Sequence, residues 1–221
     1  MKSKLLFVFT LVCLPLFARP SHSSIARRVS VSAGVLEARM ESIAYIPKFI
    51  LDEAQCIATL RSVKAGFIFG GEGSTGMVSC RLNSGEWSAP SFFNAGGASF
   101  GLLIGGQVVD SVLLFMTSSA RSSLNHAQLS LGTELSFAVG PVGEGASISA
   151  IPNAEVLTYS AGTGFYAGFS LNGLIMSHGL ARNAEVYGRN VTPRQLLMTS
   201  GSKAPELVQP FIEVLNQYAS R

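Results

Sequence analysis

One serine lies in a pattern that could serve nucleophilic catalysis. Residues 97–101 read Gly-Ala-Ser-Phe-Gly, and this G-x-S-x-G pattern around Ser99 is typical of the nucleophile elbow of α/β-hydrolases. Asp110 and then His126 or His178 follow in the chain order of that triad. The elbow requires a strand-to-helix turn, but the residues that follow are glycine-rich and strand-like, and the chain lacks an alternating β-α rhythm. A hydrolase that uses Ser99 is therefore a disfavoured alternative, and we expect no enzymatic activity.

Four basic residues in the first half of the chain could attract an anion: Lys48, Arg61, Lys64 and Arg81. If they share one face, each adds about 1 kcal/mol of attraction to an anionic bilayer. The alternative is a set of unconnected, solvated charges. Trp87 is the only tryptophan. It is either an anchor at a membrane interface or a ring that covers one end of a sheet.

The cysteines, histidines and glycine-rich loops do not indicate a metal or cofactor. After residue 18 the chain keeps two cysteines, Cys56 and Cys80, and histidines are few, so a structural zinc site is not expected. The two cysteines form either a disulfide, which an oxidising compartment permits, or a pair of buried thiols. Residues 70–76 resemble a phosphate-binding loop, but no lysine follows in the required position, and a hairpin turn at 71–76 is the favoured interpretation.

The first 18 residues have the layout of a secretory signal peptide. Lys2 and Lys4 precede an apolar run over residues 5–17, and Ala18 is a small residue suited to cleavage. The run is short for a membrane span. Lipidation at Cys13 is disfavoured because Val12 precedes it where a small residue is expected. The sequence therefore predicts export to the periplasm or cell envelope, with an uncleaved anchor as the alternative.

Charge and size exclude several classes of protein. Cleavage after Ala18 lowers the formal charge from +3 to +1, because two lysines and no acidic residue are removed. A domain that grips nucleic acid by its net charge is not supported. The 221 residues suffice for one domain with a sizeable core. Residues 19–30 are polar and contain the pair Arg27-Arg28, and we expect a flexible leader there, followed by one domain over 31–221.

The elements that must position these residues are helical at both ends and strand-like between. Three copies of a glycine-x-x-x-glycine pattern, at 66–70, 101–105 and 164–168, predict strands with bare positions on one face, because residues four apart share a face. Helices are expected from about residue 31 to 45, after Pro47, and after Pro205. The predicted fold is α+β: a single domain with a curved, barrel-like antiparallel sheet flanked by N-terminal and C-terminal helices.

Several short motifs, in this order, resemble the SYLF domain family. They cover about residues 43–198 and include Lys-Ala-Gly-Phe at 64–67, Gly-Glu-Trp-Ser-Ala-Pro at 85–90, Gly-Ala-Ser-Phe-Gly at 97–101, Gly-Pro-Val-Gly at 140–143 and Gly-Phe-Tyr-Ala-Gly at 164–168. The resemblance implies a lipid-binding, non-catalytic protein that prefers phosphoinositides and other anionic phospholipids. Eukaryotic members also bind actin, whereas a stand-alone member with a signal peptide is similar to the exported bacterial type.

Two departures from the family pattern weaken the inference of headgroup selectivity. Gln55-Cys56 replaces a frequent lysine-glycine, and Leu103 replaces a frequent glutamine. The motifs as a whole still predict an exported phospholipid-binding protein that contacts an anionic phospholipid or membrane surface. The residues expected to do so are Lys48, Arg61, Lys64 and Arg81, with apolar contact from Phe67 and Trp87. The alternative is a structural or scaffolding envelope protein that binds another protein.

Overall fold

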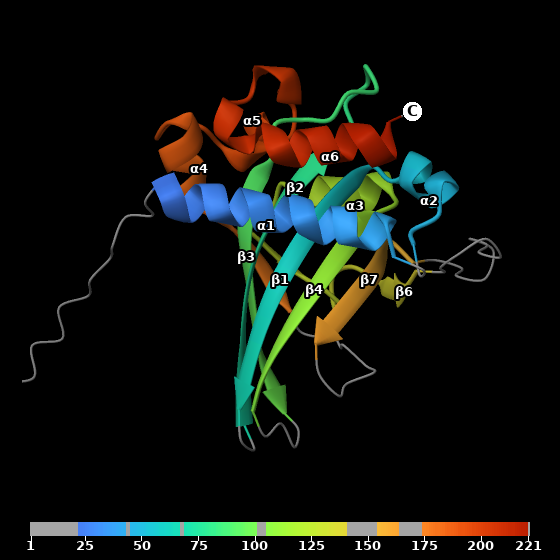
Figure 1. Cartoon of the computed structure of the whole chain (residues 1–221), viewed down its shortest axis with the longest axis vertical. Coiled ribbons are helices and arrows are strands. Elements are labelled where there is room, and N and C mark those ends of the chain that lie inside the picture. The colour runs from blue at the N-terminus through green and yellow to red at the C-terminus, as the bar shows by residue number, and fades with distance from the viewer. Residues whose placement is uncertain are drawn as a thin grey trace, which may run out of the picture.

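The computed structural model describes residues 22–42, 45–66, 69–100, 105–140, 154–163 and 174–220. Helices cover both ends of the chain and strands fill the middle, as predicted (Figure 1). The helices are α1 (His22–Met40), α2 (Lys48–Glu53), α3 (Ser118–Ser123), α4 (Leu180–Tyr187), α5 (Pro193–Leu196) and α6 (Gln209–Ala219), with short 3-10 turns η2 (Gly201–Lys203) and η3 (Glu206–Val208). The strands are β1 (Cys56–Gly66), β2 (Phe69–Cys80), β3 (Ser91–Phe100), β4 (Gly105–Phe115), β5 (Gln128–Ser130), β6 (Phe137–Val139), β7 (Val156–Thr163) and β8 (Ile175–His178).

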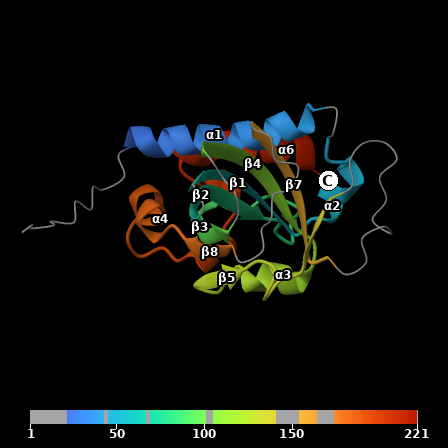
Figure 2. The same ribbon diagram turned by 90° about the horizontal axis from the view of Figure 1, so that it is seen from below.

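Eight strands form one curled sheet in the order β5-β8-β3-β2-β1-β4-β7-β6. The four long strands β1 to β4 lie together at its centre, and they extend well beyond the helices in Figure 1. The view from below shows the curl, with α1 and α6 on its outer side and α3 with β5 across from them (Figure 2). The predicted α+β fold with a curved sheet is confirmed. The sheet is mixed, because β6 pairs with β7 in parallel.

One of the three glycine patterns lies at a hairpin connection and not inside a strand. Gly66 ends β1 and pairs with Gly70 of β2, so the two glycines face each other across the hairpin. The second pattern, at 101–105, falls between β3 and β4, which are not neighbours in the sheet. Glycine suits a turn as well as a strand bend, because it lacks the side chain that restricts backbone angles. The third pattern, at 164–168, lies outside the described residues.

The glycine-rich stretch 71–76, which the sequence favoured as a hairpin turn, belongs to strand β2. Its residues pair with β1 on one side and β3 on the other without interruption. Strand pairing on both sides therefore overrides the weak strand propensity of glycine. A phosphate-binding loop at this position is excluded by the same register.

Two hydrophobic clusters cover the two faces of the sheet. The outer cluster joins the sheet to α1, α2 and α6 through residues that include Leu36, Ile50, Ile57, Leu114 and Phe211. The inner cluster fills the curl beneath α3 and β5 and includes Leu60, Phe93, Leu113, Leu124 and Met176. Alternate residues of a strand point to opposite faces, so Ile57 and Leu60 reach different clusters.

Helix α1 begins at His22, within the segment that the sequence analysis assigned to a flexible leader at 19–30. Its buried residues Ile25, Val29, Ser32 and Leu36 recur at helical spacing, so one stripe of the helix packs on the sheet. Burial of these side chains thus makes residues 22–30 part of the folded domain. As a result, Arg27 and Arg28 lie on an ordered helix beside the sheet.

Candidate functional site

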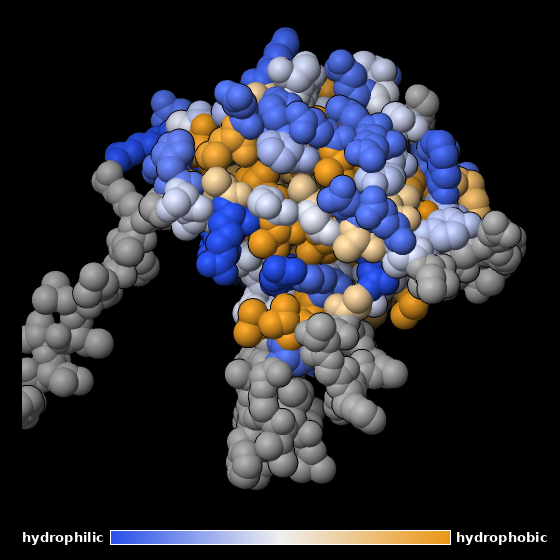
Figure 3. All heavy atoms as spheres, viewed as in Figure 1, coloured by the Kyte–Doolittle hydropathy of each residue, from blue (hydrophilic) through white to orange (hydrophobic). Residues whose placement is uncertain are grey.

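An arginine-rich groove lies between the N-terminal half of α1, the strands beneath it and the start of α4. Its volume is about 390 Å³, within the roughly 300–1,000 Å³ range of small-molecule sites. The lining of this arginine groove includes Ser24, Arg27, Arg28, Val31, Arg61, Val63, Thr75, Phe92 and Arg182. Figure 3 shows hydrophilic side chains gathered below α1 on this side of the molecule, with an apolar patch beneath them.

A second cavity of about 340 Å³ adjoins the arginine groove. The two share Ser24, Arg28 and Arg182 as lining residues, so they form one continuous depression. Among the residues that the structure describes, no aspartate or glutamate lines either cavity. Several guanidinium groups therefore converge on a space whose own walls carry no compensating acid.

Among the described residues of the groove, Arg61 is the one arginine that is hydrogen-bonded to a carboxylate. Its Nε and Nη2 donate to the two carboxylate oxygens of Asp110 at 2.6 and 2.5 Å, in a bidentate pair. The hydrogen bond to Asp110 raises the pKa of Arg61 above its ordinary value. Asp110 also faces Arg39 of α1, whose pKa is lowered by burial and raised in part by Asp110. One acid thus faces two arginines here.

Arg28 and Arg182 are held by neutral partners. Arg28 Nη1 donates to Thr75 Oγ1 at 2.8 Å, and Arg182 Nη1 donates to Asn94 Oδ1 at 2.5 Å. Burial lowers the pKa of Arg182, and the nearby charge of Arg28 lowers it further. Both side chains are half-buried. The two cations are therefore close enough to repel each other, and their hydrogen bonds to Thr75 and Asn94 neutralise neither charge.

The predicted binding residues are not brought together. Lys48 is exposed on α2, where it binds Asp52 at 2.7 Å and the Ser220 carbonyl at 2.9 Å. Helix α2 lies near one end of α1, and α4 lies near the other end (Figure 1). The side chain of Lys64 and all of Phe67 lie outside the described residues. Of the four predicted residues whose side chains the structure describes, only Arg61 lines the arginine groove.

Arg81 and Trp87 are core residues in this structure. Arg81 is 4% exposed and Trp87 is 2% exposed. The Arg81 guanidinium lies 4.3 Å from the Trp87 ring centroid and donates to the carbonyl of Ala219 at 2.8 Å. It also reaches the carbonyl of Leu51, so it binds the C-terminal ends of α6 and α2. Both side chains are thus buried where the helices pack against the sheet.

Replacing Arg81 by lysine should lower the free energy of unfolding by about 2 kcal/mol. Lysine keeps the charge but loses the planar fork that reaches two helix ends, and hydrogen bonds to charged groups contribute about 1.5–3 kcal/mol each. Urea unfolding measures the change. Exposed Arg189→Lys is the matched control. Equal stability of the two variants would contradict the structural role of Arg81.

Cys56 and Cys80 are joined in a disulfide. The two residues face each other across β1 and β2 in the strand register, and both are fully buried in the inner cluster. Of the two states that the sequence left open, the structure has the bridge. Adjacent antiparallel strands bring directly opposite side chains close enough to bond.

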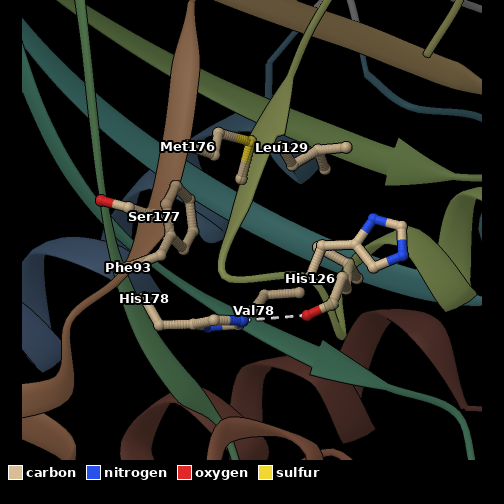
Figure 4. Close-up of a pocket in the computed structure, with 8 residues that line it drawn as sticks. Val78, Phe93, His126, Leu129, Met176, Ser177 and His178 are labelled. Atoms are coloured by element: carbon tan, nitrogen blue, oxygen red, sulfur yellow. Dashed lines mark hydrogen bonds between the residues drawn. The ribbon is translucent and has the colours of Figure 1, made fainter. Parts of the chain in front are cut away.

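A small cavity inside the curl is too narrow for a ligand (Figure 4). It has a volume of about 20 Å³, roughly the space of one water molecule, and its lining is largely apolar. His178 stands at its edge, with Nε2 3.0 Å from the Leu124 carbonyl oxygen, as the dashed line shows. Burial lowers the pKa of His178, so its imidazole is neutral at pH 7.

The residues of the hydrolase alternative do not converge. Ser99 lies within strand β3 and not on a strand-to-helix turn. It pairs with Gly70 of β2. His178 pairs with Phe93, which lies six positions before Ser99 on β3. Six residues of a strand span about 20 Å, so His178 lies far from Ser99. Asp110 binds Arg61 on the outer face, and His126 is exposed after α3. The geometry that a nucleophile elbow needs is absent from these described residues.

Comparison with known proteins now agrees with the motifs. The sequence profile of the Ysc84 family, described as "Las17-binding protein actin regulator", matches residues 96–218, which is more than half of the chain. The chain belongs to the Ysc84 (SYLF) family. This confirms the resemblance drawn from the motifs. The matched region begins within β3 and runs through β4 to β8 and α3 to α5 into α6.

Relatives of the Ysc84 family share most of this chain. Protein YSC84 of Saccharomyces cerevisiae is 31% identical over 179 residues, covering 79% of this chain and 38% of that protein. LAS seventeen-binding protein 3 of the same species is 32% identical, with 79% and 39% covered. SH3 domain-containing YSC84-like protein 1 of Rattus norvegicus is 30% identical, with 80% and 52% covered. The chain thus spans about 40 to 50% of the length of these Ysc84 relatives. No solved structure matches it significantly.

The described residues contain neither a membrane-spanning helix nor a metal-binding cluster. None of their helices has the length and apolar character that a membrane crossing requires. They also contain no group of three or more histidine, cysteine, aspartate or glutamate residues arranged to hold a metal ion.

Sequence reasoning missed three of the four arginines of the groove. Arg27 and Arg28 were assigned to a leader, and Arg182 stands alone in a mixed segment. The helical spacing of Ile25, Val29 and Leu36 was the signal that could have placed Arg28 on an ordered helix. No comparable local signal links Arg182 to Arg28, because only the fold brings α4 beside α1.

Proposed function

We propose that this Ysc84-family chain is an exported, non-catalytic protein that binds anionic phospholipid at the cell envelope. The observation that carries the proposal is the arginine groove, where Arg27, Arg28, Arg61 and Arg182 line a depression whose described walls carry no acid. A phosphate group satisfies guanidinium donors by charge-assisted hydrogen bonds. The groove is large enough for a lipid headgroup.

An apolar patch next to the groove supports a membrane ligand over a purely soluble one. Val63 and Val108 pair across β1 and β4 and are 54% and 40% exposed. Val63 also lines the arginine groove. A basic groove bordered by exposed apolar side chains fits the boundary between headgroups and acyl chains. The signal-like start and the Cys56–Cys80 disulfide support an oxidising compartment outside the cytoplasm.

Vesicle sedimentation tests the proposed function. The wild-type protein should bind vesicles that contain phosphatidylglycerol and should bind phosphatidylcholine vesicles at least tenfold more weakly. Arg27→Glu combined with Arg28→Glu should lower binding to the anionic vesicles at least tenfold, since each basic residue near the surface contributes about 1 kcal/mol.

The matched control for this test reverses two exposed arginines outside the groove. Arg189→Glu combined with Arg194→Glu makes the same change in net charge, and neither residue lines the groove. This variant should lose less than threefold in binding. Equal binding of the wild type to both vesicle types, or equal losses in the two variants, would overturn the groove as the lipid site.

Binding of another envelope protein is the second candidate function. It is favoured by the name of one relative, LAS seventeen-binding protein 3, which denotes a protein partner. Leu180 and Met198 are 62% and 66% exposed and could contribute to such a surface. This function predicts indifference to lipid composition, so the vesicle series distinguishes the two candidates.

A further inference from the structure

Arg28 and Arg182 form a pair that differs from the other arginines of the groove. They come from α1 and α4, and both line the two adjoining cavities. Arg28 donates a hydrogen bond to the hydroxyl oxygen of Thr75, and Arg182 donates one to the amide oxygen of Asn94. A guanidinium has five N–H donors, so these bonds fix the two side chains in place and leave donors directed toward the cavity.

The charges of this pair require a counterion. Two half-buried cations that share a cavity repel each other, and burial weakens the screening that water would provide. Asp110 is engaged with Arg61, and no aspartate or glutamate among the described residues lines either cavity. A ligand that carries about two negative charges would balance the pair.

The start of α4 adds polar groups to the same cavity. Gly179 is the N-cap of this helix and supplies no side-chain cap, and Leu180 and Ala181 of the first turn line the cavity beside Arg182. First-turn amides have no partner within their own helix. These amides favour a negatively charged ligand, as the two guanidiniums do. The guanidinium pair is the stronger of the two grounds for an anion site.

We propose that Arg28 and Arg182 clamp a single phosphate monoester group, with Thr75 and Asn94 holding the two guanidiniums in position. A monoester carries about −1.5 to −2 charge at pH 7 and three free oxygens, which suits two guanidinium forks, whereas a diester carries one charge and two free oxygens. This inference rests on the proposed function where the ligand is a lipid. The same chemistry could come from a phosphatidate headgroup or from a free phosphate ester.

The test compares phosphatidate with phosphatidylglycerol in vesicles adjusted to equal surface charge. The wild type should bind phosphatidate vesicles at least fivefold more tightly. Arg28→Lys combined with Arg182→Lys keeps both charges but removes the forks, so the preference should fall below twofold while phosphatidylglycerol binding changes less than twofold. Arg189→Lys combined with Arg194→Lys is the control and should keep the full preference. Thermal unfolding confirms that each variant is folded.

Calorimetric titration with glycerol 3-phosphate, in the absence of vesicles, distinguishes the two sources of phosphate. Binding that the double lysine variant loses would support the clamp and assign it to a free phosphate ester. A preference seen only with vesicles would support the clamp and assign it to a lipid. Equal affinity for the two lipids without glycerol 3-phosphate binding would overturn the clamp but leave the proposed function standing. A preference that survives in the lysine variant would also overturn it.

Discussion

Replacing Gly76 by alanine should lower the free energy of unfolding by about 3 kcal/mol or more, at the upper end of the usual cost of overpacking. A Cβ atom at this position would overlap the Thr59 carbonyl oxygen of the neighbouring strand and lie 2.8 Å from the Phe93 ring. Thr59 belongs to a central strand paired on both sides, so its backbone cannot retreat without breaking the sheet. Urea unfolding followed by circular dichroism measures the loss.

Gly73→Ala in the same strand is the matched control. A Cβ there meets nothing within 4 Å, and the position is exposed. Its stability should change by no more than about 0.5 kcal/mol, as for an ordinary surface substitution. If both variants lose similar stability, the cost comes from losing a glycine in the strand and not from the close approach at Gly76.

Replacing both cysteines by alanine should lower the free energy of unfolding by about 3 kcal/mol. The disulfide between Cys56 and Cys80 spans 24 positions, and a loop of that length restricts the unfolded chain by about this amount. Alanine at both positions avoids placing a hydroxyl in the buried inner cluster.

Reduction provides the control for the disulfide. The wild type unfolded in urea with a thiol reductant should show the lower midpoint of the double alanine variant, and the reductant should not change the variant itself. A wild-type midpoint that stays unchanged after complete reduction, verified by mass, would contradict the stabilising role of the bridge.

The helices and the class of fold could be predicted because their signals are local. The stripe of Phe211, Ile212 and Leu215 after Pro205 predicts a terminal helix, and α6 covers these residues. Thr117 has the residue type that favours a helix N-cap, and its hydroxyl accepts a hydrogen bond from the amide of Ala120 at the start of α3. Such patterns depend on neighbours a few residues away, which the sequence displays directly.

The hairpin positions could not be predicted because glycine suits both turns and strands. Residues 66–70 were expected as a strand and residues 71–76 as the turn after it, and only pairing with β1 and β3 shows that 71–76 continues the strand. The three-residue strands β5 and β6 give too short a pattern to recognise. Their place in the sheet depends on neighbours distant in the sequence.

The candidate site was predicted less well than the fold. Arg61, predicted to contact a headgroup, lines the arginine groove, whereas Arg81, predicted to do the same, is buried. Nothing in the sequence around Arg81 indicates that this cation is buried, and only the helix ends that Arg81 binds explain its position. The closeness of Arg28 and Arg182 depends on how α1 and α4, which are far apart in the sequence, are placed by the fold.

The arginine groove takes one wall from α1, near the start of the described chain, and another from α4, near its end. A nascent fragment that stops before Arg182 therefore cannot form the complete site. A ligand seated there binds only the finished fold, and at a free concentration one hundred times its Kd it adds about 2.7 kcal/mol of stability by mass action. If the ligand is the proposed lipid, its binding would also fasten the first helix against the sheet and slow proteolysis of the folded protein.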